Sequence, residues 1–305
     1  MIKWSIIISF GTLISCAALP IQTTEYSEEI SLEVGDGPED FQLDEKHNRI
    51  LIACDNRRVG YGIGEIWEID LATQKQERIE VVFKENNVKF HPHGVSIFED
   101  YLFVISHRDK DTEEIFRFKI YKDSVVQDTV FREGIIGRAN DMLAVSKDEF
   151  YYSNFKMFGG SVIHFENGEY KEFVKGFKYP NGLCIYDDQM YVTTSMSNKL
   201  FKIDMTSHEK KALLKLKGGD NLLSDGRFLY TTSHPKMMKF VKHTKSRMNN
   251  SPTVIYRIDL KTYEKQVLFS NDGEKISAGS TGFVYNGKLY IGQVFEDRIW
   301  IGTIK

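Results

Sequence analysis

The sequence is poor in cysteine, in proline and in net charge. Its 305 residues contain only three cysteines and six prolines, which excludes a disulfide-stapled scaffold and a proline-rich linker protein. The 40 basic and 43 acidic residues nearly cancel, so the formal net charge is −3. A charge this small gives no general attraction to nucleic acid or to acidic membrane surfaces. Partners must therefore be inferred from local sites.

Long hydrophobic runs are missing as well. The apolar stretch WSIIISFGTLIS follows Lys3, ends in small residues and is too short to span a bilayer. This pattern predicts a signal peptide over residues 1–16, followed by a single domain over residues 17–305. The letters LISC resemble a bacterial lipobox, so we expect Cys16 to be lipidated and to tether an exported protein to the cell envelope. Ordinary cleavage beside Ala17, followed by secretion, is the alternative.

The two other cysteines have no metal or redox signature. Cys54 lies in ILIACD and Cys184 lies in GLCIYD, and both runs are apolar and strand-like. Neither cysteine belongs to a CxxC pair, so we expect two buried free thiols.

What the sequence does contain is a repeated pair of strands. Val, Ile, Phe, Tyr and Thr recur in short runs separated by Gly, Asp and Asn, which is typical of strands and turns. Six stretches share a polar opening, alternating residues, a turn and a second strand, and each predicts an antiparallel hairpin. They are GPEDFQLDEKHNRILIACD, HPHGVSIFEDYLFVISH, RANDMLAVSKDEFYYSN, YPNGLCIYDDQMYVTTS, GGDNLLSDGRFLYTTSH and AGSTGFVYNGKLYIGQV.

Most of these hairpins are followed by a second, more charged pair of strands, for example GEIWEIDLATQKQERIEVV. A four-stranded unit that recurs six times, about every 40 to 60 residues, predicts an all-β fold, the six-bladed β-propeller. The last unit lacks its fourth strand, and TTEYSEEISLEV near the N-terminus has no hairpin of its own. We expect this strand to complete the last blade and close the ring. The basic insertion KFVKHTKSRMNNS in the fifth unit is interpreted as a solvated loop.

Propeller geometry brings the openings of the six hairpins together at one end of the central channel. Antiparallel pairing about a turn near Asp100 places His93 beside His107 at this end, and the fifth hairpin returns His234 to it. The polar residues at the six openings are Glu39 and Asp40, His93, Asn140 and Asp141, Asn181, Asp220 and Asn221, and Ser280 and Thr281.

These openings supply carboxylate and amide oxygens but no cysteine. Such a set suits a hard cation, calcium above all, and disfavours zinc. Neighbouring residues of a strand point in opposite directions, so the doublets at 39–40 and 140–141 predict two stacked cation sites. A cation at the mouth would stabilise an oxyanion during hydrolysis, while His93, oriented by His107, deprotonates water. A role in turn formation is the simpler alternative for each of these polar residues taken singly.

The motifs GPED, HPHGVS, VISH, ANDMLAV, PNGL, GGDN, SHP and GSTGFVYNGKLYIG occur in this order over nearly the whole chain. Together they resemble the paraoxonase and arylesterase family of six-bladed, calcium-dependent lactonases and esterases. By motif, the resemblance implies a catalytic calcium ion held by Glu39, Asn140, Asn181, Asp220 and Asn221. It further implies a structural calcium ion held by Asp40, Asp141 and the backbone carbonyl of Val95, a dyad of His93 and His107, and a pocket lined by His234.

Some positions depart from the family pattern. Vertebrate members have a disulfide between the N-terminus and the C-terminus, whereas TTEYSEEISLEV and WIGTIK contain no cysteine. In DNRRVGYG, Arg57 and Arg58 stand where an apolar pocket wall is expected, and Arg57 could meet an acidic or phosphorylated substrate. Tyr179, two residues before Asn181, is expected to pack as a pocket wall.

The sequence therefore predicts an enzyme that hydrolyses small lactones or aryl esters with two calcium ions and has no nucleic-acid partner. Two alternatives stay open. A sugar lactonase of the gluconolactonase and regucalcin group shares the propeller but typically uses one metal. A non-catalytic, calcium-stabilised binding propeller would keep the same oxygen ligands without turnover.

Overall fold

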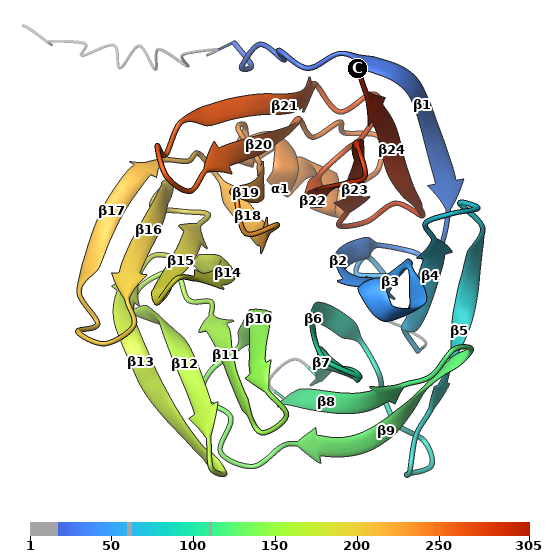
Figure 1. The fold of residues 1–305 in the computed structure, drawn as a ribbon, viewed down its shortest axis with the longest axis vertical. Coiled ribbons are helices and arrows are strands. Elements are labelled where there is room, and N and C mark those ends of the chain that lie inside the picture. The colour runs from blue at the N-terminus through green and yellow to red at the C-terminus, as the bar shows by residue number, and fades with distance from the viewer. Residues whose placement is uncertain (1–17, 60–62, 110–111) are drawn as a thin grey trace, which may run out of the picture.

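The computed structural model of the chain describes residues 18–59, 63–109 and 112–305. These residues form a ring of small sheets around a common centre (Figure 1). The expected signal peptide and the lipid attachment at Cys16 fall outside the described residues. Within the described ranges, no helix is long and apolar enough to cross a membrane.

The strands of these ranges fall into six four-stranded antiparallel blades, as the repeat predicts. The first blade contains β2 (Pro38–Asp44), the 3-10 helix η1 (Glu45–His47), β3 (Arg49–Cys54), β4 (Glu65–Asp70) and β5 (Gln76–Val82). The second contains β6 (Pro92–Phe98), β7 (Tyr101–Asp109), β8 (Thr112–Ile120) and β9 (Ser124–Phe131). The third contains β10 (Ala139–Ser146), β11 (Glu149–Asn154), β12 (Gly160–Glu166) and β13 (Glu169–Phe177).

The second half of the chain repeats this plan. The fourth blade contains β14 (Pro180–Tyr186), β15 (Gln189–Thr194), β16 (Lys199–Asp204) and β17 (Lys210–Lys215). The fifth contains β18 (Gly219–Ser224), β19 (Phe228–Ser233), the helix α1 (Met237–Lys245), β20 (Thr253–Asp259) and β21 (Lys265–Asn271). The sixth contains β22 (Gly279–Tyr285), β23 (Lys288–Gln293), β24 (Arg298–Ile304) and β1 (Tyr26–Glu33).

The N-terminal strand closes the ring, as predicted. β1 pairs antiparallel with β24 and is the outermost strand of the sixth blade (Figure 1). The ring of Tyr26 meets the ring of Trp300 edge-on, with 5.1 Å between centroids, and Trp300 also lies 4.7 Å from Phe269 of the fifth blade. Cys54 and Cys184 are buried and free, as expected. Strand pairing and aromatic packing therefore hold the seam.

At one junction in the described structure, strands of two neighbouring blades pair with each other, which the repeat did not predict. The outermost strands β5 and β9 pair in parallel, with Val81 opposite Val125, so the first two blades form one eight-stranded sheet. Between other blades, hydrophobic side chains pack face to face. Tyr230 of the fifth blade, for example, lies 5.3 Å from Phe283 of the sixth, measured between ring centroids.

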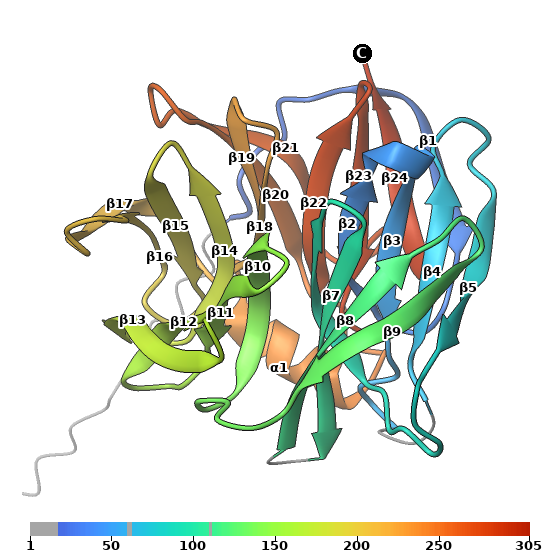
Figure 2. The same cartoon turned by 60° about the horizontal axis from the view of Figure 1, so that its bottom comes forward.

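The insertion in the fifth blade is not a solvated loop, contrary to the sequence prediction. Its residues 239–245 belong to the nine-residue helix α1, which lies at one end of the ring (Figure 2). His243 of this helix is completely buried, and its Nε2 lies 3.0 Å from Oε2 of Glu296. The lysines that suggested a loop are exposed, whereas Phe240 and His243, three residues apart, share the face turned toward the protein. Helical spacing thus buries part of a segment that is basic overall.

Replacing Trp300 by alanine is expected to lower the free energy of unfolding by about 3 to 5 kcal/mol, the usual cost of deleting a buried tryptophan. The reason is that Trp300, 3% exposed, fills the seam between the first and last strands. Urea denaturation would measure the change. Phe158→Ala is the control, because Phe158 is 73% exposed and should cost about 0.5 kcal/mol or less. A similar small cost for both variants would contradict the packed seam.

Candidate metal centre and histidine pair

In the described structure, all six innermost hairpins break register at the residues that open them. The breaks lie between Pro38 and Asp40, Pro92 and Val95, Ala139 and Met142, Pro180 and Leu183, Gly219 and Leu222, and Gly279 and Gly282. Such bulges interrupt the alternation of a strand and turn its side chains. The bulged residues are the polar openings identified from the sequence, so their side chains gather at one end of the ring.

Glycines allow the inner strands to approach one another. A Cβ on Gly182 would lie 2.5 Å from the backbone nitrogen of Leu222, and a Cβ on Gly94 would lie 2.4 Å from the carbonyl oxygen of Asn140. Only glycine fits where two backbones come this close. The polar side chains of different blades can therefore reach one another.

Glu39 lies in the middle of this polar cluster and is 3% exposed. Nδ2 of Asn221 donates to Oε1 of Glu39 over 3.3 Å and to Oγ1 of Thr281 over 2.7 Å. The other carboxylate oxygen of Glu39 lies 3.8 Å from Nε2 of His93. Residues of the first, second, fifth and sixth blades thus meet around Glu39.

Asn181, Asp220 and His234 form an adjoining chain. Nδ2 of Asn181 donates to Oδ1 of Asp220 over 2.5 Å, and Oδ2 of Asp220 lies 2.8 Å from Nε2 of His234. All three side chains are buried. The ring of Phe240 on α1 lies 4.2 Å from the ring of His234, so the helix covers this part of the cluster.

Asp40 and Asp141 bind backbone amides of the neighbouring blade. Oδ2 of Asp40 accepts from the amide of Val95 over 2.8 Å, and Oδ2 of Asp141 accepts from the amide of Leu183 over 2.7 Å. Each carboxylate also accepts from the amide that follows it in the chain. These two carboxylates therefore join the inner strands of successive blades. Val95, whose carbonyl was expected to bind a cation, lies beside Asp40.

The electrostatics of the cluster disfavour its negative charges. Burial is the main cause that raises the pKa of Glu39 to about 8, and repulsion from Asp220 and Asp40 adds to the rise. The positive charge of Arg57 opposes it. Burial raises the pKa of Asp40 to about 7. The pKa of Asp141 is raised well above its usual value by burial and then by the charge of Asp40. A cation at this point would offset the repulsion.

Three buried oxygens in the cluster have no hydrogen-bond partner: Oε2 of Glu39, Oδ1 of Asn140 and Oδ1 of Asn181. An unpaired buried polar atom costs about 1 to 3 kcal/mol. Uncharged amide oxygens beside carboxylates are the ligands that calcium prefers, so the residues present fit this ion. Among the described residues, no group of three or more His, Cys, Asp or Glu side chains is arranged as a metal site. A metal here would consequently depend on the asparagine amides as well as on the carboxylates.

His93 and His107 lie side by side, with 4.7 Å between ring centroids and 62° between ring planes. Nδ1 of His93 faces Arg57, whose Nε and Nη2 are both 3.3 Å away, and Nε2 of His93 lies 3.1 Å from Nδ2 of Asn140. Burial, followed by the positive charge of Arg57, holds the pKa of His93 well below its usual value. His93 is therefore a neutral imidazole at the edge of the oxygen cluster.

Sequence reasoning missed Glu113. This residue on β8 pairs directly with His107 on β7, and its Oε2 lies 2.5 Å from Nδ1 of His107. Its Oε1 accepts from Nε of Arg138 over 3.3 Å. Extending the register past His107 could have found this contact, but the hairpin predicted from the sequence ended at His107.

Arg57 lies in the cluster, but its donors are fully used. Its five N–H groups are directed at the carbonyl oxygens of Gly37, Asp55 and Pro92 and at Nδ1 of His93. The contact with an acidic or phosphorylated substrate that the sequence suggested would break these bonds. The residue instead fixes the orientation of the His93 ring.

Arg58 contacts α1 and the residue Glu296 beside it. Its Nη1 lies 2.9 Å from Oε1 of Glu296, and its guanidinium lies 4.5 Å from the ring centroid of Phe295. Its Nη2 also donates to the carbonyl of His243 over 3.1 Å. Arg58 thus anchors the helix, because Glu296 and the buried His243 offer it acceptors. Its place in a substrate pocket stays a prediction.

Tyr179 packs against Phe155, with 5.3 Å between ring centroids, and Arg138 lies over the other ring at 5.0 Å. Tyr179 has a φ of 58°, in the left-handed region that bulky residues rarely adopt. The charges of Arg138 and Asp220 both influence its hydroxyl, whose pKa is raised mainly by burial. Tyr179 therefore packs within reach of the charge of Asp220, and its role as a pocket wall stays a prediction.

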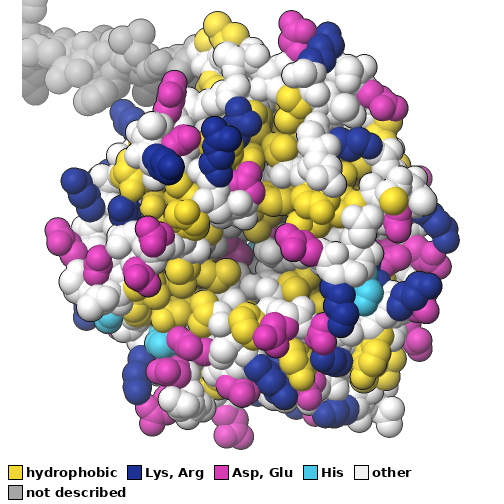
Figure 3. Space-filling view, viewed as in Figure 1, with side chains coloured by type: hydrophobic (Ala, Val, Ile, Leu, Met, Phe, Trp, Pro, Cys, Tyr) yellow, Lys and Arg dark blue, Asp and Glu magenta, His cyan; other side chains and the backbone are white. Residues whose placement is uncertain are grey.

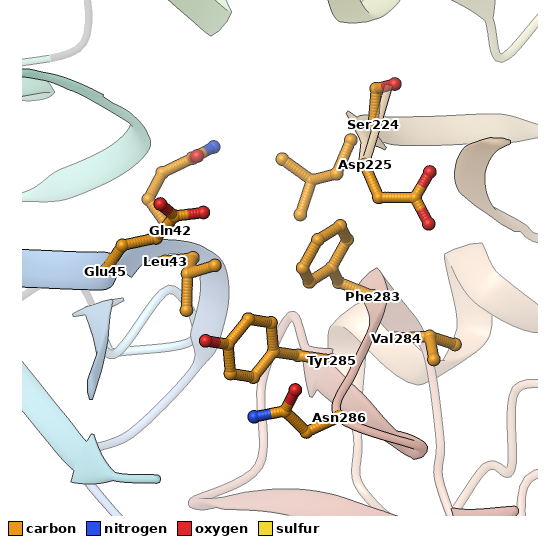
Figure 4. Close-up of a pocket in the computed structure, with 10 residues that line it drawn as sticks. Gln42, Leu43, Glu45, Ser224, Asp225, Phe283, Val284, Tyr285 and Asn286 are labelled. Carbon is orange, nitrogen blue, oxygen red and sulfur yellow. The ribbon is translucent and has the colours of Figure 1, made fainter. Parts of the chain in front are cut away.

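A different groove, with a volume of about 540 Å³, lies at the opposite ends of the inner strands. Leu43, Leu223, Phe283 and Tyr285 line it together with Asp225 (Figure 4). Hydrophobic side chains surround the central hollow of the face turned away from α1 (Figure 3). None of the buried, partnerless oxygens of the first cluster lies in this groove. The candidate site is thus the end of the ring beneath α1.

Comparisons with known proteins agree with these features. The family model described as Arylesterase matches residues 60–301. The chain is 28% identical over 272 residues to serum paraoxonase/lactonase 3 of Homo sapiens, covering 78% of this chain and 76% of the relative. It is 27% identical over 271 residues to serum paraoxonase/arylesterase 2 of Gallus gallus, with the same shares of 78% and 76%.

Two solved structures resemble the fold. Regucalcin of Agrobacterium tumefaciens, described as a calcium-binding protein, gives a TM-score of 0.60 at 11% identity, covering 92% of this chain and 94% of the other. A luciferin-regenerating enzyme gives a TM-score of 0.61 at 11% identity, covering 91% and 97%. At such identities the likeness concerns the fold alone.

Replacing Glu39 by glutamine is expected to raise the melting temperature in EDTA and to reduce the further rise that calcium produces. The amide has the same shape but removes a charge that Asp40 and Asp220 repel. We expect an increase of about 2 °C or more in EDTA, as about 1 kcal/mol gives in a large domain. Differential scanning calorimetry with and without calcium measures both shifts.

The matched control is Glu149→Gln, because Glu149 pairs with His164 outside the cluster. It should leave the response to calcium unchanged. A Glu39→Gln variant that melts earlier in EDTA, yet gains as much from calcium as the wild type, would contradict the interpretation of the cluster as a cation site.

Proposed function

Because the chain belongs to the arylesterase family, we propose that it is a calcium-dependent hydrolase of lactones and related carboxylic esters. The observation that carries this proposal is the set of buried, partnerless oxygens on Glu39, Asn140 and Asn181 beside two adjacent imidazoles. Its relatives bear the names lactonase and arylesterase. Oxygen ligands next to histidines supply what ester hydrolysis needs, namely charge stabilisation and proton transfer.

In this proposal two calcium ions bind at the axis. The ligands of the catalytic ion are Glu39, Asn140, Asn181, Asp220 and Asn221. The ligands of the structural ion are Asp40, Asp141 and the carbonyl of Val95. When bound, calcium supplies Lewis-acid stabilisation of the negative charge that develops on the carbonyl oxygen of the substrate.

The residues of the chain orient the reactants and move the proton. The dyad of His93 and His107 takes a proton from water, and Arg57 keeps the His93 ring in place through its bonds to Nδ1. Asp220 holds Nε2 of the pocket residue His234. Tyr179 and Phe155 offer an apolar wall for the alkyl or aryl part of the substrate. Phe240 on α1 limits access of water on the side of His234.

The proposed substrates are neutral. The N–H groups of Arg57 donate to acceptors within the protein, and Arg58 is paired with Glu296. No other partner class is required, and the near-zero net charge favours neither nucleic acid nor an acidic surface. We further propose export, since the relatives are named serum proteins, with attachment to the cell envelope through a lipid on Cys16.

The first test is hydrolysis of a panel of aliphatic lactones, aryl esters and sugar lactones by the purified full-length chain. We expect turnover in excess calcium, loss of turnover after chelation, and recovery when calcium is restored. Turnover restricted to sugar lactones would favour a sugar lactonase instead. No turnover by a folded, calcium-loaded protein on any substrate would favour a binding propeller.

Replacing Asn221 by alanine should raise the calcium concentration needed for half-maximal activity by about 10-fold or more, as loss of a metal-supporting contact commonly does. Asn221 is the residue whose amide links Glu39 and Thr281. Titrating calcium into chelator-treated enzyme while following turnover measures the shift. Asn86→Ala, at an exposed turn, is the control, and an equal shift in both variants would exclude a specific role for Asn221.

A further inference from the structure

Arg138 opens the stretch RANDMLAV of the third blade, two residues before the proposed calcium ligand Asn140. Its amide donates to Oδ1 of Asn154 over 3.1 Å, and its carbonyl oxygen accepts from the amide of Phe155 over 3.0 Å. These bonds hold the backbone of Arg138 at the end of the ring that carries the candidate site. The side chain is 46% exposed, so the guanidinium at this end is in contact with solvent.

The side chain of Arg138 lies between the histidine pair and the aromatic pair of Phe155 and Tyr179. Its Nε donates to Oε1 of Glu113 over 3.3 Å, and the other oxygen of Glu113 lies 2.5 Å from Nδ1 of His107. On its other side, the guanidinium lies 5.0 Å from the ring centroid of Phe155, which packs against Tyr179. Arg138 therefore lies at the rim of the site, next to the proposed apolar wall.

The charge of Arg138 acts on both of these neighbours. Burial is the main cause that lowers the pKa of His93, and the positive charge of Arg138 adds to this effect. Burial also raises the pKa of Tyr179, and the charge of Arg138 opposes this rise. The guanidinium is therefore close enough to interact with a small molecule that lies between the histidine pair and the aromatic pair.

Two nitrogens of this guanidinium are available to a ligand. Within the described ranges of the chain, Nη1 and Nη2 of Arg138 donate to no protein acceptor. Arg57, by contrast, directs its donors at carbonyl oxygens and at His93, and Arg58 is paired with Glu296. Glu113 occupies only Nε of Arg138, so the edge formed by Nη1 and Nη2 stays open.

An open guanidinium edge of this kind suits a carboxylate. Its two parallel N–H groups meet the two carboxylate oxygens, and the opposite charges strengthen both hydrogen bonds. The proposed substrates are neutral, but their hydrolysis produces a carboxylic acid. Because such an acid has an ordinary pKa of about 4, it is an anion at neutral pH. The proposed reaction thus creates the chemical group that this edge of Arg138 matches.

We propose that Nη1 and Nη2 of Arg138 bind the carboxylate of the hydroxy acid product at the rim of the site. This inference rests on the proposed function and adds to it a binding site for the product. A neutral lactone gains little from the guanidinium, so the site distinguishes product from substrate. The alkyl chain of the bound product lies against Phe155 and Tyr179, where the next substrate would bind. The enzyme is therefore inhibited competitively by its own product.

The test uses the full-length, calcium-loaded chain, with δ-valerolactone as substrate and its hydrolysis product 5-hydroxypentanoate as inhibitor. Arg138→Gln should raise the inhibition constant about 5- to 10-fold, the effect of losing a charge-assisted pair of hydrogen bonds at a partly exposed site. The KM for the neutral lactone should change much less. Arg138→Lys keeps the charge without the fork and should recover part of the inhibition. The uncharged analogue 1,5-pentanediol should not inhibit the wild type.

Arg108→Gln is the matched control. The side chain of Arg108 is also 46% exposed, and its Nη1 donates over 3.3 Å to the buried carboxylate of Glu114. This variant removes the same charge from a similar ion pair and should leave the inhibition constant unchanged. Equal inhibition of the wild type and Arg138→Gln, or the same rise in both variants, would overturn the carboxylate site while leaving the proposed hydrolysis standing.

A wild type that hydrolyses neither this lactone nor any other ester would overturn the proposed function. Calorimetric titration of 5-hydroxypentanoate into the calcium-loaded chain would then decide the inference by itself. Binding that Arg138→Gln weakens, and that Arg108→Gln does not, would support the carboxylate site. Absence of binding to the wild type would overturn it.

Discussion

The accumulation of buried negative charge at the axis of the ring is the constraint on which the rest of the structure depends. Glu39, Asp40, Asp141 and Asp220 come from three different blades and are nearly inaccessible to water. Coulomb repulsion and lost hydration would force their strands apart or protonate them unless a cation or a dense set of donors compensated. Backbone amides provide part of the compensation at Asp40 and Asp141. The oxygens of Glu39 and of two asparagines that lack a hydrogen-bond partner show where the protein alone leaves the negative charge uncompensated.

The shape of the backbone brings these buried carboxylates together at the axis. Each inner hairpin gives up regular pairing at its opening, and glycines such as Gly94 and Gly182 bring the strands within backbone contact. The packing between blades then opposes any outward relaxation, because moving one inner strand would disturb the hydrophobic clusters that it shares with a neighbouring blade. Rigidity of this kind favours a cation with many irregular oxygen ligands.

The sequence predicted a large part of the molecule because the propeller repeats itself. The six hairpins, the role of β1 and the meeting of His93 with His107 all follow from strand alternation and turn positions, which are local properties. The features that the sequence did not predict depend on contacts between segments that do not occupy equivalent positions in the repeat. Glu113 lies beyond the end of the hairpin predicted from the sequence, and it is buried by its contacts with His107 and Arg138. The same limitation explains why α1 was taken for a loop, since the acceptors that bury His243 belong to another blade.

Closure of the ring by β1 also determines when folding can be completed during synthesis of the chain. The partner of Tyr26 is Ile304, so the seam joins residues from the two ends of the sequence. A chain emerging from the ribosome cannot complete this seam until its last strand has been made, and contacts so distant in sequence form slowly. Until then the first and last blades expose unpaired edges and apolar side chains. With the export proposed above, this delay would be useful, because the ring could not complete its fold before translocation.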